Sequence, residues 1–102
     1  MTPVEELKKL TGESDEELLS LLLDTAEDAV LNYTGREILP KRLVKTKIKW
    51  ALIAYNRLGM EGEAARNEGE ISQTFVDIPA DILSVLKRYR LAKVGGKTYE
   101  KT

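Results

Sequence analysis

The residues best suited to chemistry are three carboxylates, Asp24, Glu27 and Asp28, which a single predicted helix brings together. Clustered carboxylates can bind a metal ion or act as acid and base. The chain of 102 residues contains no His and no Cys, however, and no other polar residue is placed to complete such a site. We therefore interpret the three carboxylates as a solvated acidic face of a helix. No catalytic, cofactor-binding or metal-binding residue is predicted.

Enzymes of familiar kinds leave other signatures, and these are missing too. No pair of residues forms a convincing nucleophile and base, and no glycine-rich motif is spaced to cradle a phosphate. The lack of cysteine removes disulfides and thiolate chemistry and fits a reducing compartment. No apolar run approaches the roughly 20 residues that a membrane span needs. We expect a soluble protein, intracellular when made, without a cofactor, a membrane contact or an enzymatic activity.

Basic side chains form the second candidate site. The segment from Lys41 to Lys49 carries five of them, and Lys and Arg can neutralise the phosphates of a nucleic acid. Against direct DNA binding stand a formal net charge of -1, the lack of interleaved aromatic residues and the lack of a recognisable recognition-helix unit. A small helical DNA-binding regulator that uses this basic helix stays open as the alternative function.

Acidic and basic blocks alternate along the chain. Residues 13–35 and 61–81 are mainly acidic, whereas residues 36–57 and 87–101 are mainly basic. Such blocks are typical of neighbouring helices with complementary solvated faces within one subunit. The same pattern also suits complementary surfaces on two subunits, where it would steer assembly and fix the register of the contact.

The elements that carry these charges indicate an all-α fold, a small bundle of about four helices. The length suits one domain, which we place at residues 1–94, followed by a flexible tail at 95–102. Apolar residues recur at the spacing of helices over approximately residues 3–11, 15–33, 40–58 and 79–92.

Capping signals mark the starts of these helices. The caps that we predict are Thr2 with Glu5, Ser14 with Glu17, and Asp77 ahead of Pro79. The third helix is ambiguous, because Lys45, Lys47 and Lys49 alternate with less polar residues in the period of a strand. A helix covers more of this segment consistently, since apolar residues step by three and four from Val44 to Leu58.

The apolar faces of the four helices predict one modest hydrophobic core. On the second helix Leu19 and Leu23 widen the apolar stripe, as a helix buried on one broad side requires. The expected core members are Leu18, Leu22, Ala26, Val30, Tyr33, Ile48, Ala51, Leu52, Tyr55, Leu58, Ile82, Leu86 and Tyr89.

The long gap between the third and fourth helices is the segment that local patterns explain least. Residues 59–77 read as a protruding loop rich in glycine and glutamate, which ends in a short β-prone run at 71–76. Loops of this length are commonly functional or disordered. The run can form a short strand that pairs with another chain. Equally, the segment can be a mobile surface loop whose Phe75 packs into its own core.

Three stretches of sequence resemble one known family. They are LLLDTAEDAVLNYTGRE from Leu21, YNRLGMEGEAARNEGEISQTF from Tyr55, and DIPADIL with the LKRYR that follows it. In this order and spacing, over roughly residues 5–94, the chain resembles the small head-to-tail connector, or adaptor, proteins of long-tailed bacteriophages and their prophage relatives. The resemblance implies a structural subunit of a closed ring, expected to be dodecameric, beneath the portal of the DNA-filled head.

The same resemblance implies the partners. The ring extends the DNA channel, which genomic DNA crosses without sequence-specific binding, and it offers a platform to a downstream neck or tail-completion protein. We expect the protein in the neck of the virion and, during assembly, in the host cytoplasm. A ring requires that two different patches of one subunit meet on neighbours. The residues that we expect at the interface with a neighbour or the portal are Glu61, Gly62, Glu63, Arg66, Glu68, Gly69, Glu70, Ile71, Ser72, Gln73, Thr74, Phe75, Lys87, Arg88 and Arg90.

Overall fold

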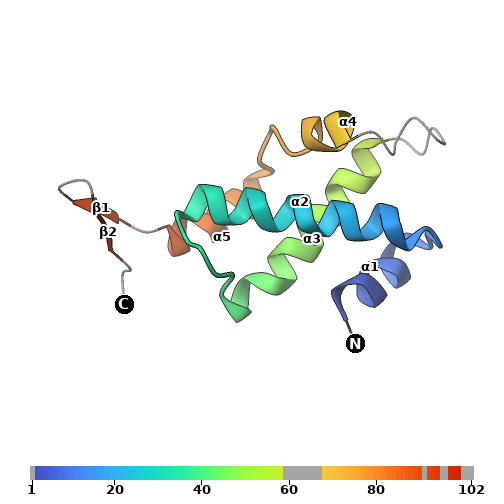
Figure 1. Ribbon diagram of the computed structural model, residues 1–102, viewed down its shortest axis with the longest axis horizontal. Coiled ribbons are helices and arrows are strands. Elements are labelled where there is room, and N and C mark those ends of the chain that lie inside the picture. Colours follow the sequence, from blue (N-terminus) through green and yellow to red (C-terminus); the bar gives the residue numbers. More distant parts are fainter. Residues whose placement is uncertain (1, 59–67, 91, 95–96, 100–102) are drawn as a thin grey trace.

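The computed structural model describes residues 2–58, 68–90, 92–94 and 97–99 of the chain (Figure 1). Over these residues the fold is a small helical bundle, which confirms the all-α prediction. A short antiparallel ladder follows the last helix. The elements in chain order are α1 (Pro3–Thr11), α2 (Glu16–Thr34), the 3-10 turn η1 (Lys41–Leu43), α3 (Val44–Leu58), α4 (Glu68–Gln73), α5 (Ala80–Tyr89), β1 (Ala92–Val94) and β2 (Lys97–Tyr99).

The long helices α2 and α3 pack on each other and form the frame of the molecule (Figure 1). The helix α1 contacts both of them at one end of the bundle, and α4 and α5 also contact both. In Figure 1 the C-terminal ends of α2 and α5 lie on the left of the bundle, with the β1–β2 ladder beyond them. Every surface discussed below is therefore positioned by its packing against α2 or α3.

The first two helices begin and end where their capping residues dictate. At α1 the predicted capping box is confirmed, because Thr2 Oγ1 accepts from the Glu5 N–H and Glu5 Oε1 accepts from the Thr2 N–H. Gly12 ends α1 with φ of +74°, a left-handed conformation that costs glycine little. At α2 the prediction of Ser14 as the cap is wrong. Asp15 takes this role and accepts from the Leu18 N–H at 3.3 Å.

The third and last helices differ from their predicted bounds at their ends. The segment from Lys41 is helical, as predicted, but it starts as the 3-10 turn η1 and becomes an α-helix only at Val44. The start of α5 follows Pro79, which occupies the N-cap position, so the prediction of Asp77 as the cap is wrong. At its other end α5 stops at Tyr89, because Arg90 is extended with ψ of 130°.

The C-terminal ladder replaces the predicted end of the last helix. The strand pairs are Ala92 with Tyr99, Lys93 with Thr98, and Val94 with Lys97. The prediction of a helix as far as residue 92 is wrong, because α5 ends at Tyr89 and Ala92 begins β1. The flexible tail from residue 95 stays a prediction, and 95–96 and 100–102 lie outside the described residues. The sequence holds a hairpin signal here, because two glycines separate short runs that contain Val, Thr and Tyr.

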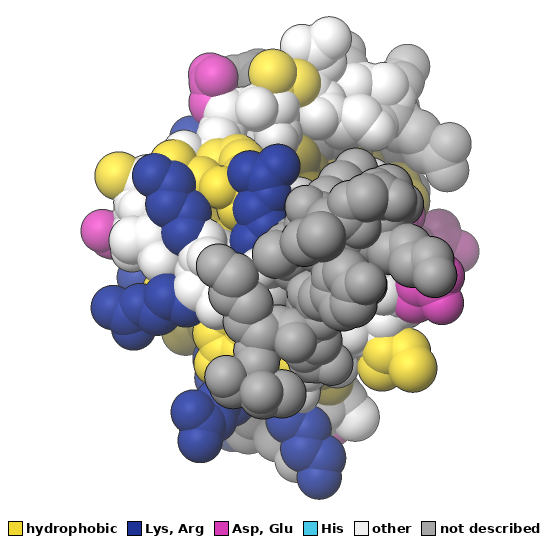
Figure 2. Space-filling view, turned by 90° about the vertical axis from the view of Figure 1, so that its left-hand side faces the viewer, with side chains coloured by type: hydrophobic (Ala, Val, Ile, Leu, Met, Phe, Trp, Pro, Cys, Tyr) yellow, Lys and Arg dark blue, Asp and Glu magenta, His cyan; other side chains and the backbone are white. Residues whose placement is uncertain are grey.

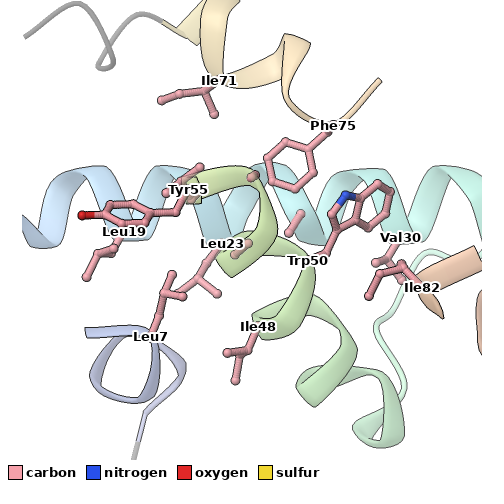
Figure 3. Packing of buried hydrophobic residues seen from close by; sticks show 14 of the residues in the cluster. Leu7, Leu19, Leu23, Val30, Ile48, Trp50, Tyr55, Ile71, Phe75 and Ile82 are labelled. Atoms are coloured by element: carbon pink, nitrogen blue, oxygen red, sulfur yellow. The ribbon is translucent and has the colours of Figure 1, made fainter. Parts of the chain in front are cut away.

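The hydrophobic core lies where α2 and α3 meet the three shorter helices (Figure 3). Most of the predicted members are buried, whereas Tyr33, Leu52, Leu58 and Tyr89 are partly buried and pack against it. Trp50 is 1% exposed and lies between Phe75 and Ile82 in Figure 3. Leu19 and Leu23, which the sequence places on the apolar stripe of the second helix, are buried as well. The other buried hydrophobic residues outside the predicted set are Leu7, Leu43, Trp50, Ala54, Ile71 and Phe75.

Candidate assembly interface

The predicted β-prone run is helical in its first half, which corrects the expectation of a strand at 71–76. Residues 68–73 form α4, and the chain leaves it through tight turns in which the Phe75 N–H donates to the Ser72 carbonyl oxygen at 3.1 Å. The reason is the spacing of Ile71 and Phe75. Residues four apart share one face of a helix, so a helical turn brings both of these side chains onto the core together. A strand would also place Ile71 and Phe75 on one face, but with the polar Gln73 between them on that face, whereas the helical turn leaves Gln73 exposed.

The two large apolar residues of this run belong to the core of the subunit. Ile71 is fully buried and Phe75 is 7% exposed. The Phe75 ring packs against Trp50 with a centroid separation of 5.4 Å and a tilt of 58° (Figure 3). Of the two interpretations of Phe75 that the sequence leaves open, packing into its own core is the one observed. Phe75 and Ile71 therefore position α4 and expose almost no surface for a partner.

The other predicted interface residues of this segment divide into two groups. Glu61, Gly62, Glu63 and Arg66 lie outside the described residues. Glu68, Gly69, Glu70, Ser72 and Gln73 lie in α4, and Thr74 lies in the turn after it. Of these, Gly69, Ser72 and Gln73 are exposed and Thr74 is half-buried. The Thr74 hydroxyl donates to the Ile71 carbonyl oxygen at 2.6 Å. The structure thus leaves the outer side of α4 as the accessible part of this predicted interface.

Arg57 fastens this region to the end of α3, a role that the sequence did not reveal. Its Nη1 donates to the carbonyl oxygens of Thr74 at 2.9 Å and Asp77 at 3.0 Å. Both acceptors belong to the connection between α4 and α5. A guanidinium that bonds two carbonyl oxygens fixes their separation, so this one side chain sets the position of the connection relative to α3.

A basic surface forms where α2 and α5 end. Figure 2 shows Lys and Arg side chains prominent on this end of the molecule. The Arg90 guanidinium lies 5.0 Å from the centre of the Tyr33 ring, and the Arg36 guanidinium lies 5.9 Å from that of Tyr89. Arg36 Nε also donates to the Tyr89 carbonyl oxygen at 2.8 Å. These contacts fasten the end of α5 to the end of α2.

The last turn of α5 continues this basic surface outward. Lys87 and Arg88 are exposed there, as predicted for interface residues, and neither forms an ion pair with any residue that the structure describes. Their position at the C-terminal end of a helix is electrostatically favourable for the subunit by itself. Two adjacent cations are therefore held on the surface with their charge available to a partner.

The lysines of the Lys41–Lys49 segment are mostly engaged inside the subunit. Lys45 Nζ donates to Glu6 Oε1 of α1 at 2.6 Å. Lys47 Nζ donates to Glu27 Oε1 of α2 at 3.1 Å. Lys49 Nζ lies 3.9 Å from Asp81 Oδ2 of α5. Each alternate lysine of α3 thus pairs with a different helix.

This arrangement explains the alternation of charge along the chain. The basic block of α3 faces acidic residues of its own subunit, as expected if complementary faces belong to neighbouring helices. A surface that binds DNA through these three lysines would have to break the pairs. The basic segment is therefore a poor candidate for a nucleic-acid interface.

A hydrogen-bonded carboxylate joins the α1–α2 connection to α3. Glu13 Oε1 accepts from the Tyr55 hydroxyl at 3.0 Å, and Glu13 Oε2 accepts from the Asp15 N–H at 2.9 Å. The bond from the Asp15 N–H, followed by that from Tyr55, lowers the pKa of the Glu13 carboxyl. Burial, followed by the hydrogen bond to Glu13, raises the pKa of the Tyr55 hydroxyl. The hydrogen bond between Tyr55 and Glu13 therefore has a structural role, because it holds the α1–α2 connection against α3.

An acidic groove runs between α2 and α4. Its volume is about 440 Å³, and Asp24 and Asp28 stand on its α2 side. Both carboxylates are exposed, and neither forms an ion pair within the described part of the chain. Glu27, which the sequence groups with them, points instead to Lys47. The full set of lining residues is Leu21, Asp24, Thr25, Asp28, Ala29, Asn32, Ser72 and Phe75.

The chemistry available at these surfaces is that of binding. Among the described residues, no group of three or more His, Cys, Asp or Glu side chains is placed to hold a metal ion. No described helix is long and apolar enough to cross a membrane. One buried polar side-chain atom of the described residues, Trp50 Nε1, lacks a hydrogen-bond partner. Figure 3 shows it on the edge of the indole that faces Phe75, whose ring offers a weak acceptor.

Comparison with known families places this fold and these surfaces in context. The family model described as "Phage gp6-like head-tail connector protein" matches residues 1–90. The chain belongs to this family. The connector is thus a structural protein of the phage neck, and the match spans every helix of the bundle. Searches of curated proteins and of solved structures gave no match.

Proposed function

We propose that this connector assembles with copies of itself into a closed ring that docks on the portal, extends the DNA channel and links the head to the tail. The observation that carries the proposal is the match of residues 1–90 to a family of head–tail connectors. A dodecameric ring on the portal is the expected arrangement. A downstream neck or tail-completion protein would bind the opposite face, and assembly would take place in the host cytoplasm before the ring becomes part of the virion neck.

Ring closure needs two unlike patches on each subunit, because a head-to-tail contact repeats around an axis only if one patch meets a different one. The subunit carries patches of opposite charge. Asp24 and Asp28 are exposed beside the α2–α4 groove, and Lys87 and Arg88 are exposed on the last turn of α5. These charges are not consumed by ion pairs among the described residues, which supports their use between subunits.

The proposed interface keeps most of the residues suggested by the sequence. It comprises the surface side of α4 at Ser72 and Gln73, the segment 61–70, whose last three residues begin α4, and the basic end formed by Lys87, Arg88 and Arg90. Ile71 and Phe75 contribute indirectly, because they hold α4 on the core. Genomic DNA would pass through the ring without sequence-specific contacts. The alternative of a DNA-binding regulator is disfavoured, since Lys45, Lys47 and Lys49 pair with carboxylates of their own subunit.

Electron microscopy of the purified protein mixed with the portal from the same phage tests this function. We expect portals that carry an additional closed ring coaxial with the channel. Portals that remain bare over a wide range of protein concentrations, with the protein folded, would contradict the proposal. A protein that instead binds short duplex DNA tightly, with a steep dependence on salt, would favour the regulator.

A replacement within the loop tests the contribution of the segment before α4. Residues 61–66 are exchanged for a Gly/Ser segment of equal length, which spares Ile71 and therefore the core. We expect unchanged thermal unfolding but loss of rings on portals. Glu37→Gln, at an exposed carboxylate outside the proposed surfaces, serves as the control. Normal decoration of portals by the loop variant would show that this segment is not part of the interface, without contradicting the proposal of a ring.

A further inference from the structure

We propose that the α2–α4 groove of one subunit receives the last turn of α5 from a second copy of this chain. In this contact Asp24 and Asp28 of one copy face Lys87 and Arg88 of the next. The proposal rests on the ring assembly proposed above and names the two patches that would meet.

The acidic side of the contact is a groove with a suitable shape and charge. Asp24 and Asp28 lie four residues apart on α2, so both carboxylates project from the same face about 6 Å apart along the helix axis. Like charges at this spacing repel each other and slightly destabilise an isolated helix. Neither carboxylate forms an ion pair with a described cation of the subunit. A cationic partner bound at the groove would reduce the repulsion between Asp24 and Asp28.

The floor of the groove is partly apolar, which suits the side chains of Lys and Arg. Leu21, Ala29 and the small exposed part of Phe75 line it together with the two carboxylates. Lys and Arg cover apolar surface with their aliphatic stems while their charged ends stay near polar groups or water. A volume of about 440 Å³ accommodates a few side chains of that size but not a folded element. A pair of long cationic side chains therefore fits the groove better than an acidic or aromatic segment.

The basic side of the contact is exposed and lies on a helix end that is fastened to α2. Lys87 and Arg88 belong to the last turn of α5, and the neighbouring contacts of Arg36 with Tyr89 and of Arg90 with Tyr33 fix that turn on α2. A fixed helix end loses less conformational freedom on binding than a flexible segment does. Both cations lack an ion-pair partner among the described residues.

The two patches are different surfaces of one chain, so their contact is heterologous. Each subunit would offer its α5 turn to one neighbour and its groove to the other, which is the connectivity that a closed ring requires. Complementary charge would also fix the direction of assembly, because groove against groove or turn against turn would place like charges together.

Charge reversal tests the contact on portals, with ring decoration read by electron microscopy across a concentration series. We expect Asp24→Lys with Asp28→Lys to raise the half-maximal concentration at least about tenfold, and Lys87→Glu with Arg88→Glu to do the same. The chain that carries all four reversals should recover to near the wild-type value, because the reversed patches again match. Lys41→Glu with Arg42→Glu, at exposed cations of η1, is the matched control and should decorate normally.

The outcomes separate this inference from the proposed function. If wild-type protein forms rings and either reversed pair decorates portals normally, the proposed contact between the α5 turn and the groove is refuted, while the proposed ring is not. If both pairs fail but the fourfold variant also fails, the partner of these charges is not a second copy, and the inference is again overturned. If circular dichroism shows that a reversed pair is unfolded, Asp24→Asn with Asp28→Asn and Lys87→Gln with Arg88→Gln replace the reversals. Each neutral pair should then weaken decoration several-fold, and unchanged decoration would refute the contact.

Discussion

At the scale of single residues, the packing of Phe75 on Trp50 decides how the α4 region should be understood. Both rings are almost fully buried, and the contact joins α3 to the turn that follows α4. Phe75, which the sequence alone leaves open as a docking residue, is therefore part of the hydrophobic core. The two roles can be distinguished by truncation. Truncating a core residue lowers the stability of the subunit, whereas truncating a docking residue weakens binding and leaves stability unchanged.

We expect Phe75→Ala to lower the free energy of unfolding by about 3 kcal/mol or more, since it removes buried ring contacts and leaves a cavity. Chemical denaturation followed by circular dichroism measures this. Val76→Ala is the matched control, because Val76 is 69% exposed and its truncation should change stability by no more than about 0.5 kcal/mol. If the Phe75→Ala variant has normal stability but fails to decorate portals, Phe75 is an interface residue and its assignment to the core is wrong.

The Glu13 carboxyl predicts a specific dependence of stability on pH. Its pKa is lowered in the folded state by the Asp15 N–H and the Tyr55 hydroxyl, so the ionised form stabilises the fold. That contribution is present above the usual carboxyl pKa of 4.5 and disappears as the pH falls through the lower pKa of the folded state. We expect the stability difference between wild type and Glu13→Gln to be largest near neutral pH and to shrink below pH 4.5. A difference that stays constant or grows on acidification would contradict this.

At the scale of elements, α3 organises the charges as well as the core. Its alternate lysines pair with α1, α2 and α5, so the segment that most resembles a nucleic-acid surface in sequence has these charges matched by carboxylates of its own subunit. The pair of Lys47 with Glu27 is the best protected, because the Lys47 side chain is 13% exposed. Exposed ion pairs contribute little to stability, so this one should be the strongest of the three.

A double-mutant cycle of Lys47→Ala and Glu27→Ala measures that pair. We expect a coupling free energy of about 0.5 to 1 kcal/mol, which should decrease as salt is added. The same cycle on Lys49 and Asp81, which are 3.9 Å apart and largely exposed, is the control and should give a smaller coupling. Equal couplings in the two cycles would mean that burial does not distinguish the pairs.

The elements also show which features a sequence reveals. The long helices α2 and α3 were predicted because their apolar periodicity extends over many turns. The short helix α4 was not, since its stability comes from packing Ile71 and Phe75 on distant residues, and the local pattern fits a strand equally well. The separate partners of Lys45, Lys47 and Lys49 depend on how three helices pack around α3, which no local pattern contains. The groove was missed for the same reason, as α2 and α4 are far apart in sequence.

At the scale of the whole molecule, the connector is a small bundle that offers an acidic groove and a basic helix end on one rigid frame. Three lysines of α3 pair with carboxylates of other helices, whereas the exposed charges of the two patches form no ion pair among the described residues. The chain belongs to the head–tail connector family, and a head–tail connector must contact other proteins at the junction of head and tail. Exposed charged patches are suited to such contacts.

The most direct test of the account is a reconstruction by cryo-electron microscopy of the neck of the assembled virion, at a resolution that resolves helices. We expect a closed ring next to the portal into which copies of this bundle fit head to tail, with the last turn of α5 of each copy in the α2–α4 groove of the next. A neck in which no density between portal and tail accepts the bundle, or in which the copies meet as two-fold pairs, would contradict the account.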